Sequence, residues 1–392
     1  MSVLSSLSLS EDQVFVLNKI SDFLLLSNPE RELRIGGLAG TGKTTMIAKY
    51  LNENRSSLQS KLSFATFTGK AAERLMHSFK SFGLDIEVMT LHRLIYLTVL
   101  DPISQKLRFI EHETLPAFIV IDEASMVSEE YYNLLMDPSK GVTKIIFVGD
   151  HGQLPPIVKD NEKPFNLMEN PTIKLEQIHR QCAGNPIIEL AYAVRNASSV
   201  NEVLRLIHQS SIRKVSREGS FEGSLELSNA SSWNHVVHIV YKNATRVSIN
   251  QQFSSLVSTD TEKQPIIVLK NKHVSENVFL ANGSRGLITR FHSQKIEEFD
   301  ILDVDFPFSG KVSYIKAPKS IWNNPKPETF LPNQEWIPMD WAYAITCHKA
   351  QGSSWKNVFV WLNDVHRGDL DFLKRWIYTA ITRTEQNVYF VI

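Results

Sequence analysis

The sequence has only two cysteines, Cys182 and Cys347, among its 392 residues, so a disulfide framework cannot hold the fold together. No apolar run approaches the ~20 residues that a membrane-spanning helix needs, and this excludes a helical membrane protein. The first residues also lack the basic segment and the unbroken apolar core of a secretory signal. Together these absences predict a protein of the reducing cytoplasm that has no membrane partner.

An excess of charge of either sign is absent as well. The 42 Lys and Arg residues balance the 42 Asp and Glu residues, and the formal net charge is zero. Such a chain has no global basic field that attracts a polyanion, so any nucleic-acid site must be a local groove. Internal repeats and low-complexity tracts are also missing from the sequence.

The length and the hydrophobic pattern predict two α/β domains. A chain of 392 residues exceeds what one hydrophobic core usually serves. Short β-branched runs alternate with longer amphipathic stretches, which is typical of a parallel sheet covered by helices. We therefore predict domains at 1–180 and 181–392. The strand-like runs lie at 118–121, 144–148, 236–240, 341–345, 358–361 and 388–392.

Two segments depart from this α/β pattern. Residues 97–116 hold two short strand-like runs joined by Asp101-Pro102-Ile103-Ser104, which predicts a β-hairpin inserted in the first domain. Residues from about 291 to 338 alternate short strands with prolines, which predicts a small β insertion in the second domain. Most aromatic side chains of this insertion are expected in its core, and one or two could instead face nucleic acid. The aromatic residues are Phe306, Phe308, Tyr314, Trp322, Phe330 and Trp336.

The strongest local motif matches the phosphate-binding pattern G-x-x-x-x-G-K-[ST] between an apolar strand and a helical segment. Its glycines let backbone N–H groups converge on the β- and γ-phosphates, and Lys43 adds a positive charge. The alternative is an ordinary glycine-rich turn before a helix. The motif predicts a site for ATP and Mg²⁺ in which Thr44 binds the metal. The residues expected to bind nucleotide here are Gly37, Gly40, Thr41, Gly42, Lys43, Thr44 and Thr45.

Two further strand ends carry polar residues that suit this chemistry. Asp122 and Glu123 follow the run 118–121, where Asp122 would hold Mg²⁺ and Glu123 would activate the attacking water. Gln153 follows the run 144–148, where it could contact the γ-phosphate and detect its loss. An acidic surface pair and a proline-rich surface turn are the alternatives for these two segments.

Eight motifs in a fixed order resemble the superfamily 1 helicases of the RecD and Dda type, most of all the compact Dda members. The resemblance extends from Gln13 to Arg383 and implies two tandem RecA-like P-loop domains. It also implies that the hairpin is a strand-separating pin and that the second insertion is a small SH3-like β-barrel. ATP-driven movement along single-stranded DNA from 5′ to 3′, with separation of duplex strands, is the implied activity. The motifs are GLAGTGKTT, FTGKAA, TLH, IDEAS, GDHGQLPP, LEQIHRQ, ITCHKAQG and YTAITRT.

The resemblance assigns roles to four residues outside the phosphate loop. Arg180 and Arg383 would approach the γ-phosphate across the cleft between the domains and stabilise the charge of the transition state. With Lys43, Glu123 and Gln153 they form the expected catalytic set. Gln13 would recognise adenine, although Ser10-Glu11-Asp12-Gln13 is also a capping box. Phe109 would stack on bases at the fork, or else pack onto the domain.

Each domain carries residues that suit contacts with a nucleic-acid backbone. Hydroxyls, helix N-termini and lysines hold phosphates. Helix capping by Thr90 and Thr346, and burial of His92, are the alternatives. Phe67 stands where relatives often have proline, and we expect it in the core. The predicted strand-binding residues are Thr68, Lys70, Thr90 and His92 in the first domain and Asn243, Thr346, His348 and Lys349 in the second.

The expected partners are single-stranded DNA and its junctions with duplex, with replication or recombination proteins nearby, and a monomer is expected. Two other functions remain open. One is an ATP-binding switch that binds a partner protein without moving along DNA. The other is an RNA-directed motor of the same superfamily, since a site that binds phosphates does not by itself sense the 2′-hydroxyl.

Overall fold

The computed structural model describes residues 9–54, 62–100, 107–157, 165–175, 184–257, 263–270, 272–275, 278–280, 282–292, 298–307, 309–322, 324 and 336–392. The chain divides into two compact units, Met1–Ile188 and Glu189–Ile392, whereas the sequence suggested a division after residue 180. The division falls within helix α7 (Pro186–Asn196). Within the described ranges, no helix is both long enough and apolar enough to cross a membrane.

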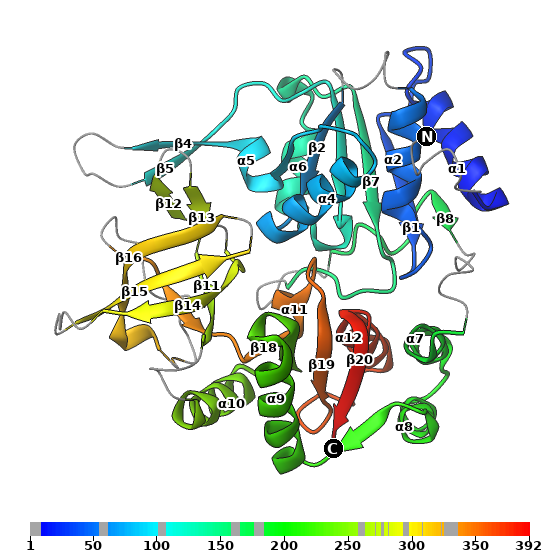
Figure 1. The fold of residues 1–392 in the computed structure, drawn as a ribbon. Coiled ribbons are helices and arrows are strands. Elements are labelled where there is room, and N and C mark those ends of the chain that lie inside the picture. The colour runs from blue at the N-terminus through cyan, green and yellow to red at the C-terminus, as the bar shows by residue number, and fades with distance from the viewer. Residues whose placement is uncertain are drawn as a thin grey trace. The chain divides into compact units, whose positions relative to one another are not determined.

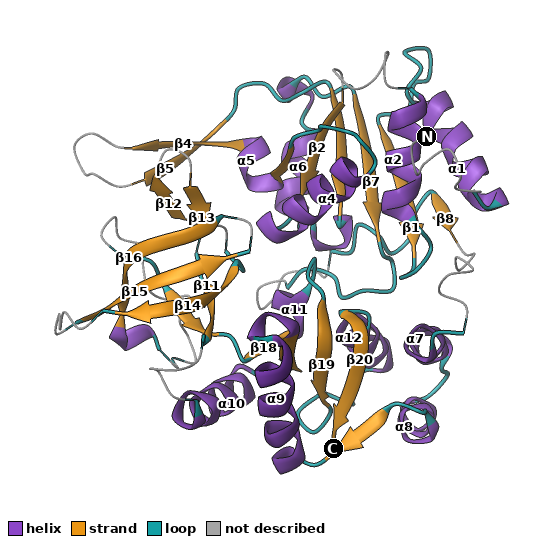
Figure 2. Ribbon diagram, in the orientation of Figure 1, coloured by secondary structure: helices purple, strands orange, loops and turns teal. Residues whose placement is uncertain are grey.

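Unit 1 is built on a six-stranded sheet with the order β3-β2-β6-β7-β1-β8, in which every neighbouring pair is parallel (Figures 1 and 2). Buried apolar runs form the central strands, as the pattern predicted. The parallel order places the carboxyl ends of all six strands at one edge. The strands are β1 (Glu32–Gly37), β2 (Leu62–Thr66), β3 (Val88–Thr90), β6 (Phe118–Asp122), β7 (Lys144–Gly149) and β8 (Ile173–Leu175).

Helices pack on both faces of this sheet because alternate strand residues enter two different cores. Phe64, Val120 and Ile146 belong to a core with α1, α2 and α4, whereas their neighbours Ala65 and Ile121 belong to a core with α5 and α6. The helices are α1 (Glu11–Phe23), α2 (Lys43–Glu53), α4 (Gly69–Ser81), α5 (Leu91–Ile95) and α6 (Glu129–Met136), with 3₁₀ turns η2 (Ala124–Met126) and η3 (Pro138–Lys140).

A two-stranded antiparallel sheet lies between α5 and β6 in the chain, where the sequence predicted a hairpin. It pairs β4 (Tyr96–Leu100) with β5 (Leu107–Glu111), from Tyr96 opposite Glu111 to Leu100 opposite Leu107. The predicted turn Asp101–Ser104 lies outside the described residues.

Unit 2 contains a five-stranded sheet with the order β18-β10-β19-β20-β9, in which every neighbouring pair is also parallel (Figure 1). The strands are β9 (Arg213–Val215), β10 (Val236–Val240), β18 (Ala344–Thr346), β19 (Trp355–Trp361) and β20 (Thr384–Val391). The accompanying helices are α8 (Val200–Gln209), α9 (Arg217–Ser231), α10 (Asn243–Leu256), α11 (Cys347–Ala350) and α12 (Leu370–Ile381), with the 3₁₀ turn η4 (Trp233–His235).

The β insertion of unit 2 begins earlier than the sequence indicated. A five-stranded antiparallel sheet with the order β16-β15-β14-β11-β17 starts at Pro265 rather than near 291. Its two edge strands are linked by a hydrogen bond: the Ile337 amide, two residues before β17, donates to the carbonyl of Lys316 in β16 at 2.9 Å. The strands are β11 (Pro265–Val268), β14 (Arg285–Phe291), β15 (Phe299–Phe306), β16 (Gly310–Pro318) and β17 (Met339–Trp341), with the 3₁₀ turn η5 (Lys319–Ile321); β12 (Lys272–Ser275) and β13 (Val278–Leu280) form a separate pair.

The predicted strand 341–345 is wrong in one respect, because the structure divides it between two sheets. Trp341 ends β17 of the antiparallel sheet, and Ala344 begins β18 of the parallel sheet. The Asn250 side chain stabilises the junction: its amide nitrogen donates to the carbonyls of Trp341 and Ala344, and its oxygen accepts from the Ala344 amide. The insertion therefore shares one hydrophobic core with the parallel sheet.

Candidate functional site

The phosphate-binding motif forms the turn between the carboxyl end of β1 and the first residue of α2. Two of its glycines, Gly40 and Gly42, have positive φ angles of 82° and 73°, which glycine adopts without strain. At Gly37 a Cβ atom would lie 2.5 Å from the Thr41 hydroxyl, so a side chain there would force the Thr41 side chain to move. The sequence thus folds this segment into a narrow turn whose backbone N–H groups precede a helix N-terminus.

Lys43 and Gln13 both contact this turn through their side chains. The Lys43 ammonium group donates to the carbonyls of Gly37 at 2.6 Å and Leu38 at 3.2 Å. The buried Gln13 amide donates to the Thr41 carbonyl at 3.0 Å, and its oxygen accepts from the Ser10 amide at 3.1 Å. The capping box is therefore present, and it holds a side-chain amide against the phosphate loop. Recognition of adenine by Gln13 stays a prediction.

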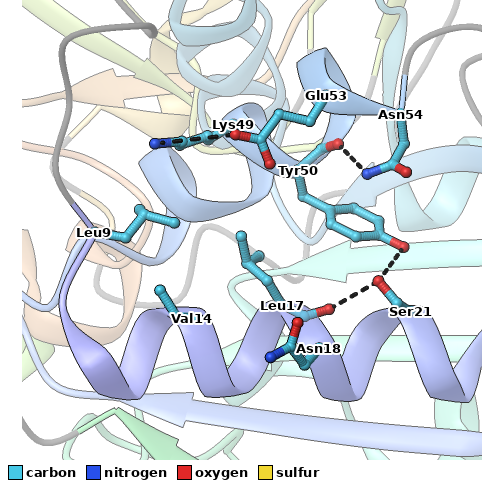
Figure 3. Close-up of a pocket in the computed structure, with 9 residues that line it drawn as sticks. All are labelled: Leu9, Val14, Leu17, Asn18, Ser21, Lys49, Tyr50, Glu53 and Asn54. Carbon is cyan, nitrogen blue, oxygen red and sulfur yellow. Dashed lines mark hydrogen bonds and ion pairs between the residues drawn. The ribbon is translucent and has the colours of Figure 1, made fainter.

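A groove of about 410 Å³ between α1 and α2 shows how the helix that carries Gln13 is positioned (Figure 3). The hydroxyls of Ser21 on α1 and Tyr50 on α2 lie 3.2 Å apart, and the Asn54 amide donates to the Tyr50 carbonyl at 2.9 Å. Burial raises the pKa of Tyr50, which keeps its hydroxyl neutral. The groove contains no residue of the phosphate loop, so we interpret it as a helix–helix contact that fixes α1.

Asp122 and Glu123 stand at the carboxyl end of β6, two strands from β1 in the sheet. Burial and the neighbouring Glu123 carboxylate raise the pKa of Asp122 to about 6, against the opposing charges of Lys43 and Arg74. Glu123 has a positive φ of 54°, which is unfavourable for a residue with a Cβ atom. The Glu123 amide donates to the Asp122 carboxylate at 2.9 Å. The strained backbone therefore holds two adjacent carboxylates at the end of the strand.

Gln153 lies in the turn that follows β7, the strand between β1 and β6. The Asp150 carboxylate accepts from the Gly152 amide at 2.8 Å and from the Gln153 side chain at 3.4 Å. Gln153 is only 4% exposed, so the alternative of a proline-rich surface turn is wrong for this residue. A Cβ atom at Gly149 would lie 3.0 Å from the Ser125 amide, which means that this strand end packs directly against the turn after Asp122.

The three strand ends of β1, β6 and β7 are neighbours at one edge of the sheet, and their oxygens suit Mg²⁺. Magnesium is usually held by one or two carboxylates together with substrate phosphates, not by a cage of protein ligands. Asp122 offers a carboxylate close enough to Lys43 for their charges to interact, and Thr44 lies in the first turn of α2 with Thr45. In the described ranges no group of three His, Cys, Asp or Glu side chains gathers to hold a metal alone.

Arg74 is a residue near this edge that the sequence reading missed. It lies on α4 four residues after Lys70, so both side chains extend from one face of the helix. Its positive charge acts to lower the pKa of Asp122. Burial also raises the pKa of Glu73 on the same helix to about 7, against the opposing charge of Lys70. The spacing of four residues between Lys70 and Arg74 is the sequence feature that could have identified Arg74.

The hydroxyls of Thr68 and Thr90 both cap helices, which was the alternative stated for Thr90. Thr68 accepts from the Ala71 amide at 3.2 Å, and Thr90 accepts from the Arg93 amide at 3.2 Å. These caps place both threonines at helix N-termini that follow strands of the parallel sheet, β2 and β3. Capping occupies one lone pair of each hydroxyl and leaves contact with a phosphate chemically possible.

His92 and Phe109 lie side by side, because the hairpin returns past the helix from which it starts. Their ring centroids are 4.7 Å apart with the planes at 90°, and Tyr96 contacts His92 at 5.0 Å. Burial lowers the pKa of His92, so the imidazole is neutral at pH 7. Phe109 remains 49% exposed, which fits neither a free side chain nor a core residue. Phe67 packs on Tyr131 at the edge of the core, as expected.

In unit 2, Asn243 is the first residue of α10 and is exposed. Its side-chain oxygen accepts from the Arg246 Nε at 3.2 Å, and Arg246 forms a buried ion pair with Asp340 of β17. The Asp364 carboxylate accepts from the Lys242 amide at 3.0 Å and fixes the start of the helix. Arg246 and Asp340, which the sequence reading did not single out, thus position Asn243.

The segment Thr346–Ala350 joins β18 to the short helix α11. Thr346 stands at the N-cap position but makes no side-chain capping bond, so the capping predicted for it is wrong. Burial lowers the pKa of His348 to about 4 and raises that of the buried Cys347, while Lys349 is exposed. This segment therefore offers one exposed lysine and a neutral imidazole.

Arg383 follows α12 and is 5% exposed. Its Nε donates to the Thr379 carbonyl at 3.1 Å, and its guanidinium also donates to the Thr382 hydroxyl at 3.2 Å. Arg383 is therefore a buried, hydrogen-bonded residue and not a solvated surface arginine. Arg180 lies outside the described residues, so its predicted role receives no structural account.

Two protein families match the chain. The AAA domain family matches residues 21–217, which is half of the sequence, and the UvrD-like helicase C-terminal domain matches residues 341–391. The first match contains the three strand ends described above, and the second contains the segment Thr346–Ala350 and Arg383.

Three similar proteins are each matched over nearly the whole chain. They are the RecBCD enzyme subunit RecD of Buchnera aphidicola (25% identical, 95% of this chain and 72% of that protein), the ATP-dependent RecD2 DNA helicase of Deinococcus radiodurans (26%, 97% and 48%) and the ATP-dependent DNA helicase PIF1 of Xenopus laevis (26%, 98% and 61%). The chain thus spans about half to three-quarters of the length of these relatives.

Solved structures of Pif1 helicases share the fold. A Bacteroides Pif1 helicase in complex with ADP-AlF3 and single-stranded DNA is 19% identical, with a TM-score of 0.58 over 98% of this chain and 92% of the other. The Pif1 helicase of Candida albicans is 15% identical, with a TM-score of 0.55 over 98% and 94%. Both support tandem RecA-like domains for this chain.

Proposed function

Because the chain belongs to the AAA domain family and is a superfamily 1 helicase of the RecD2 and Pif1 type, we propose that it hydrolyses ATP to move along single-stranded DNA from 5′ to 3′ and separates duplex strands. The observation that carries this proposal is the meeting of three motifs at one sheet edge. The phosphate loop, the Asp122–Glu123 pair and the Gln153 turn follow the neighbouring strands β1, β6 and β7.

Lys43 stabilises the negative charge of the γ-phosphate, and Glu123 accepts a proton from the attacking water. Asp122 and Thr44 hold Mg²⁺, which neutralises phosphate charge when bound. Gln153 contacts the γ-phosphate and detects its loss through the Asp150 turn. Arg180 and Arg383 stabilise charge in the transition state, as the family resemblance implies.

The nucleic-acid contacts remain proposals that the local geometry supports. Thr68 and Thr90 stand at helix N-termini, where N–H groups and hydroxyls suit a phosphate backbone, and Lys70 adds a charge. Asn243, Thr346, His348 and Lys349 are the counterparts proposed for unit 2. We further propose that the chain acts as a monomer in the cytoplasm and works beside replication or recombination proteins. The proposal of such partner proteins is supported by one relative, which is named as a subunit of the RecBCD enzyme.

Hydrolysis of ATP stimulated by single strands tests the motor against the two other functions. The proposal predicts strong stimulation by single-stranded DNA, whereas a partner-binding switch predicts none. An RNA-directed motor predicts stimulation by RNA in preference to DNA. Single-stranded DNA and RNA of the same sequence, compared at one salt concentration, therefore separate the three functions.

Binding to single strands should weaken steeply with salt although the net charge of the chain is zero. Each phosphate that a lysine or helix N-terminus neutralises releases counterions, and the logarithm of the affinity falls by about 0.7 per contact for each tenfold rise in salt. A fluorescent oligonucleotide titrated at several salt concentrations measures this slope. Affinity that does not change with salt would remove phosphate contacts from the proposal.

Replacement of Phe109 by alanine should slow strand separation and leave movement on single strands intact. The half-exposed ring, in the middle of β5, offers a stacking face, and loss of such a face costs ~1–3 kcal/mol, or about tenfold in the unwinding rate. The ATP site is not altered. The measurements are duplex unwinding and single-strand-stimulated ATP hydrolysis on the same variant.

Ile110→Ala is the matched control, because Ile110 is the next residue of β5 and is 51% exposed, nearly as much as Phe109. Ile110 points to the opposite face of the strand and should tolerate the change in both assays. A Phe109→Ala variant that loses unwinding and ATP hydrolysis together, with a lower melting temperature, would instead show that the ring stabilises the hairpin against His92.

A further inference from the structure

The backbone of Tyr314, in the antiparallel sheet of unit 2, has a conformation that is unusual for a residue with a side chain. Its φ angle is 57°, and among the described residues only Glu123 and Ser232 also combine a positive φ with a side chain. The residue is 70% exposed, so burial does not offset the strain. Strained residues that persist are typical of functional sites, and Glu123 in the same chain is one.

Two irregularities in strand pairing meet beside Tyr314. The register of β15 shifts against β14 between Ile288 and Arg290, and it shifts against β16 between Leu302 and Val304. Both shifts lie next to Asp303. Bulges of this kind turn a side chain away from the regular pleat and often occur beside binding sites.

The Asp303 side chain, only 4% exposed, holds Tyr314 and His292 in place. Its carboxylate accepts from the Tyr314 amide at 3.0 Å and lies 2.8 Å from the His292 Nε2, and the Lys311 ammonium lies 3.4 Å away. Burial would raise the pKa of Asp303, but the hydrogen bonds with His292 and Tyr314 hold it at about 2. The carboxylate is therefore ionised at all physiological pH values and fixes the strained backbone of Tyr314.

His292 covers one face of the Tyr314 ring. The two ring centroids lie 4.4 Å apart with the planes inclined by 28°, which is a stacked geometry. Because Tyr314 as a whole is still 70% exposed, we infer that the other face of its ring is open to solvent. A flat ring supported from behind by a second ring and open in front has the form of a stacking platform.

Two cations lie beside this platform, one of which, Lys311, is also paired with the buried Asp303. Lys311 is 58% exposed, and Arg290 is exposed on the adjacent strand β14. Of the two carboxylates on this part of β15, Asp303 is buried and paired, while Asp305 is exposed opposite Lys311. Two exposed cations thus accompany one exposed carboxylate and an aromatic face.

We propose that Tyr314, supported by His292, stacks on a base of single-stranded nucleic acid, while Lys311 contacts the adjacent phosphate. This inference rests on the proposed function and names a second contact for the same substrate. Stacking needs no sequence preference, because every base has a flat face. It explains why the ring is exposed, supported and held in a strained backbone.

The test compares four variants of the full chain in binding to oligothymidylate. Tyr314→Gly removes the ring without strain, since glycine adopts a positive φ freely, and affinity should fall about tenfold. Tyr314→Phe keeps the ring and should retain affinity. The matched control is Phe15→Ala, because Phe15 is an exposed aromatic residue of unit 1 (52%) outside any proposed strand contact. Lys311→Gln should lower the salt slope by about 0.7.

A photoreactive oligonucleotide that contains 5-iodouracil gives a direct readout, since it crosslinks to stacked aromatic rings, and mass spectrometry should locate the crosslink at Tyr314. Unchanged affinity of Tyr314→Gly together with no crosslink overturns the proposal, and this is also the result expected if the ring binds a protein. Failure of the proposed function has a different signature: the wild-type chain would then show no ATP hydrolysis stimulated by single strands, whatever the Tyr314 variants do.

Discussion

Replacement of Lys43 by alanine should reduce ATP hydrolysis by roughly 10²–10³-fold or more, because the γ-phosphate loses the positive charge that stabilises its transition state. The ammonium group lies against the phosphate loop, 2.6 Å from the Gly37 carbonyl, and its charge reaches Asp122. The variant should fold normally, since Lys43 is only partly buried. Steady-state ATP hydrolysis with saturating single-stranded DNA is the measurement.

Lys49→Ala on the same helix is the matched control for this result. Lys49 is paired with Glu53 at 4.0 Å, on a part of α2 that is distant from the phosphate loop in sequence, so hydrolysis should stay near the wild-type rate. A third variant, Glu123→Gln, should bind ATP normally and fail to hydrolyse it. Normal turnover in Lys43→Ala or in Glu123→Gln would contradict the assignment of the site.

Replacement of Asp340 by alanine should destabilise unit 2 by ~3–5 kcal/mol, because it leaves the buried Arg246 cation without its partner. The side chains of Arg246 and Asp340 are 6% and 0% exposed, and the Asp340 carboxylate also accepts from the Trp341 amide at 2.8 Å. Arg246 holds Asn243, so binding to single strands should weaken as well. Urea unfolding followed by the fluorescence of the tryptophans measures the stability; unit 1 is expected to unfold in a separate step.

Two controls separate loss of the ion pair from loss of a charge in general. Asp371→Ala removes a carboxylate that is 61% exposed and paired with Arg375 and Arg195, and it should cost only ~0–1 kcal/mol. The double variant Arg246→Met with Asp340→Leu should recover most of the stability, because neither side chain then carries an uncompensated charge. If Asp340→Ala is no more harmful than Asp371→Ala, the buried pair does not stabilise the junction.

Local sequence patterns were sufficient to predict the edge of the sheet where the nucleotide is proposed to bind. The phosphate loop, Asp122 and Gln153 each follow a buried apolar run, and parallel strands bring their carboxyl ends to one edge. The hairpin at β4 and β5 was also readable, because two short strands flank turn residues. In these segments the information lies within about ten residues, so propensity and spacing decide the structure.

The sequence could not predict features that depend on distant partners. The run Pro265–Val268 looks like a buried parallel strand, yet it pairs antiparallel with β14 and β17 and begins the insertion earlier than expected. The run 341–345 is divided between two sheets by Asn250, a residue more than ninety positions away. The stack of Tyr314 on His292 likewise depends on two bulges, and no local pattern indicates where a bulge occurs.

Strand separation on duplexes that carry one single-stranded tail tests the central claim most directly. One substrate has a 5′ tail and the other a 3′ tail of the same sequence, and each is incubated with the wild-type chain, ATP and Mg²⁺. We predict ATP-dependent opening of the 5′-tailed duplex alone, with no opening by Lys43→Ala. Absence of ATP-dependent opening on both substrates would contradict the claim that this chain is a DNA motor, and opening of the 3′-tailed duplex alone would contradict its direction.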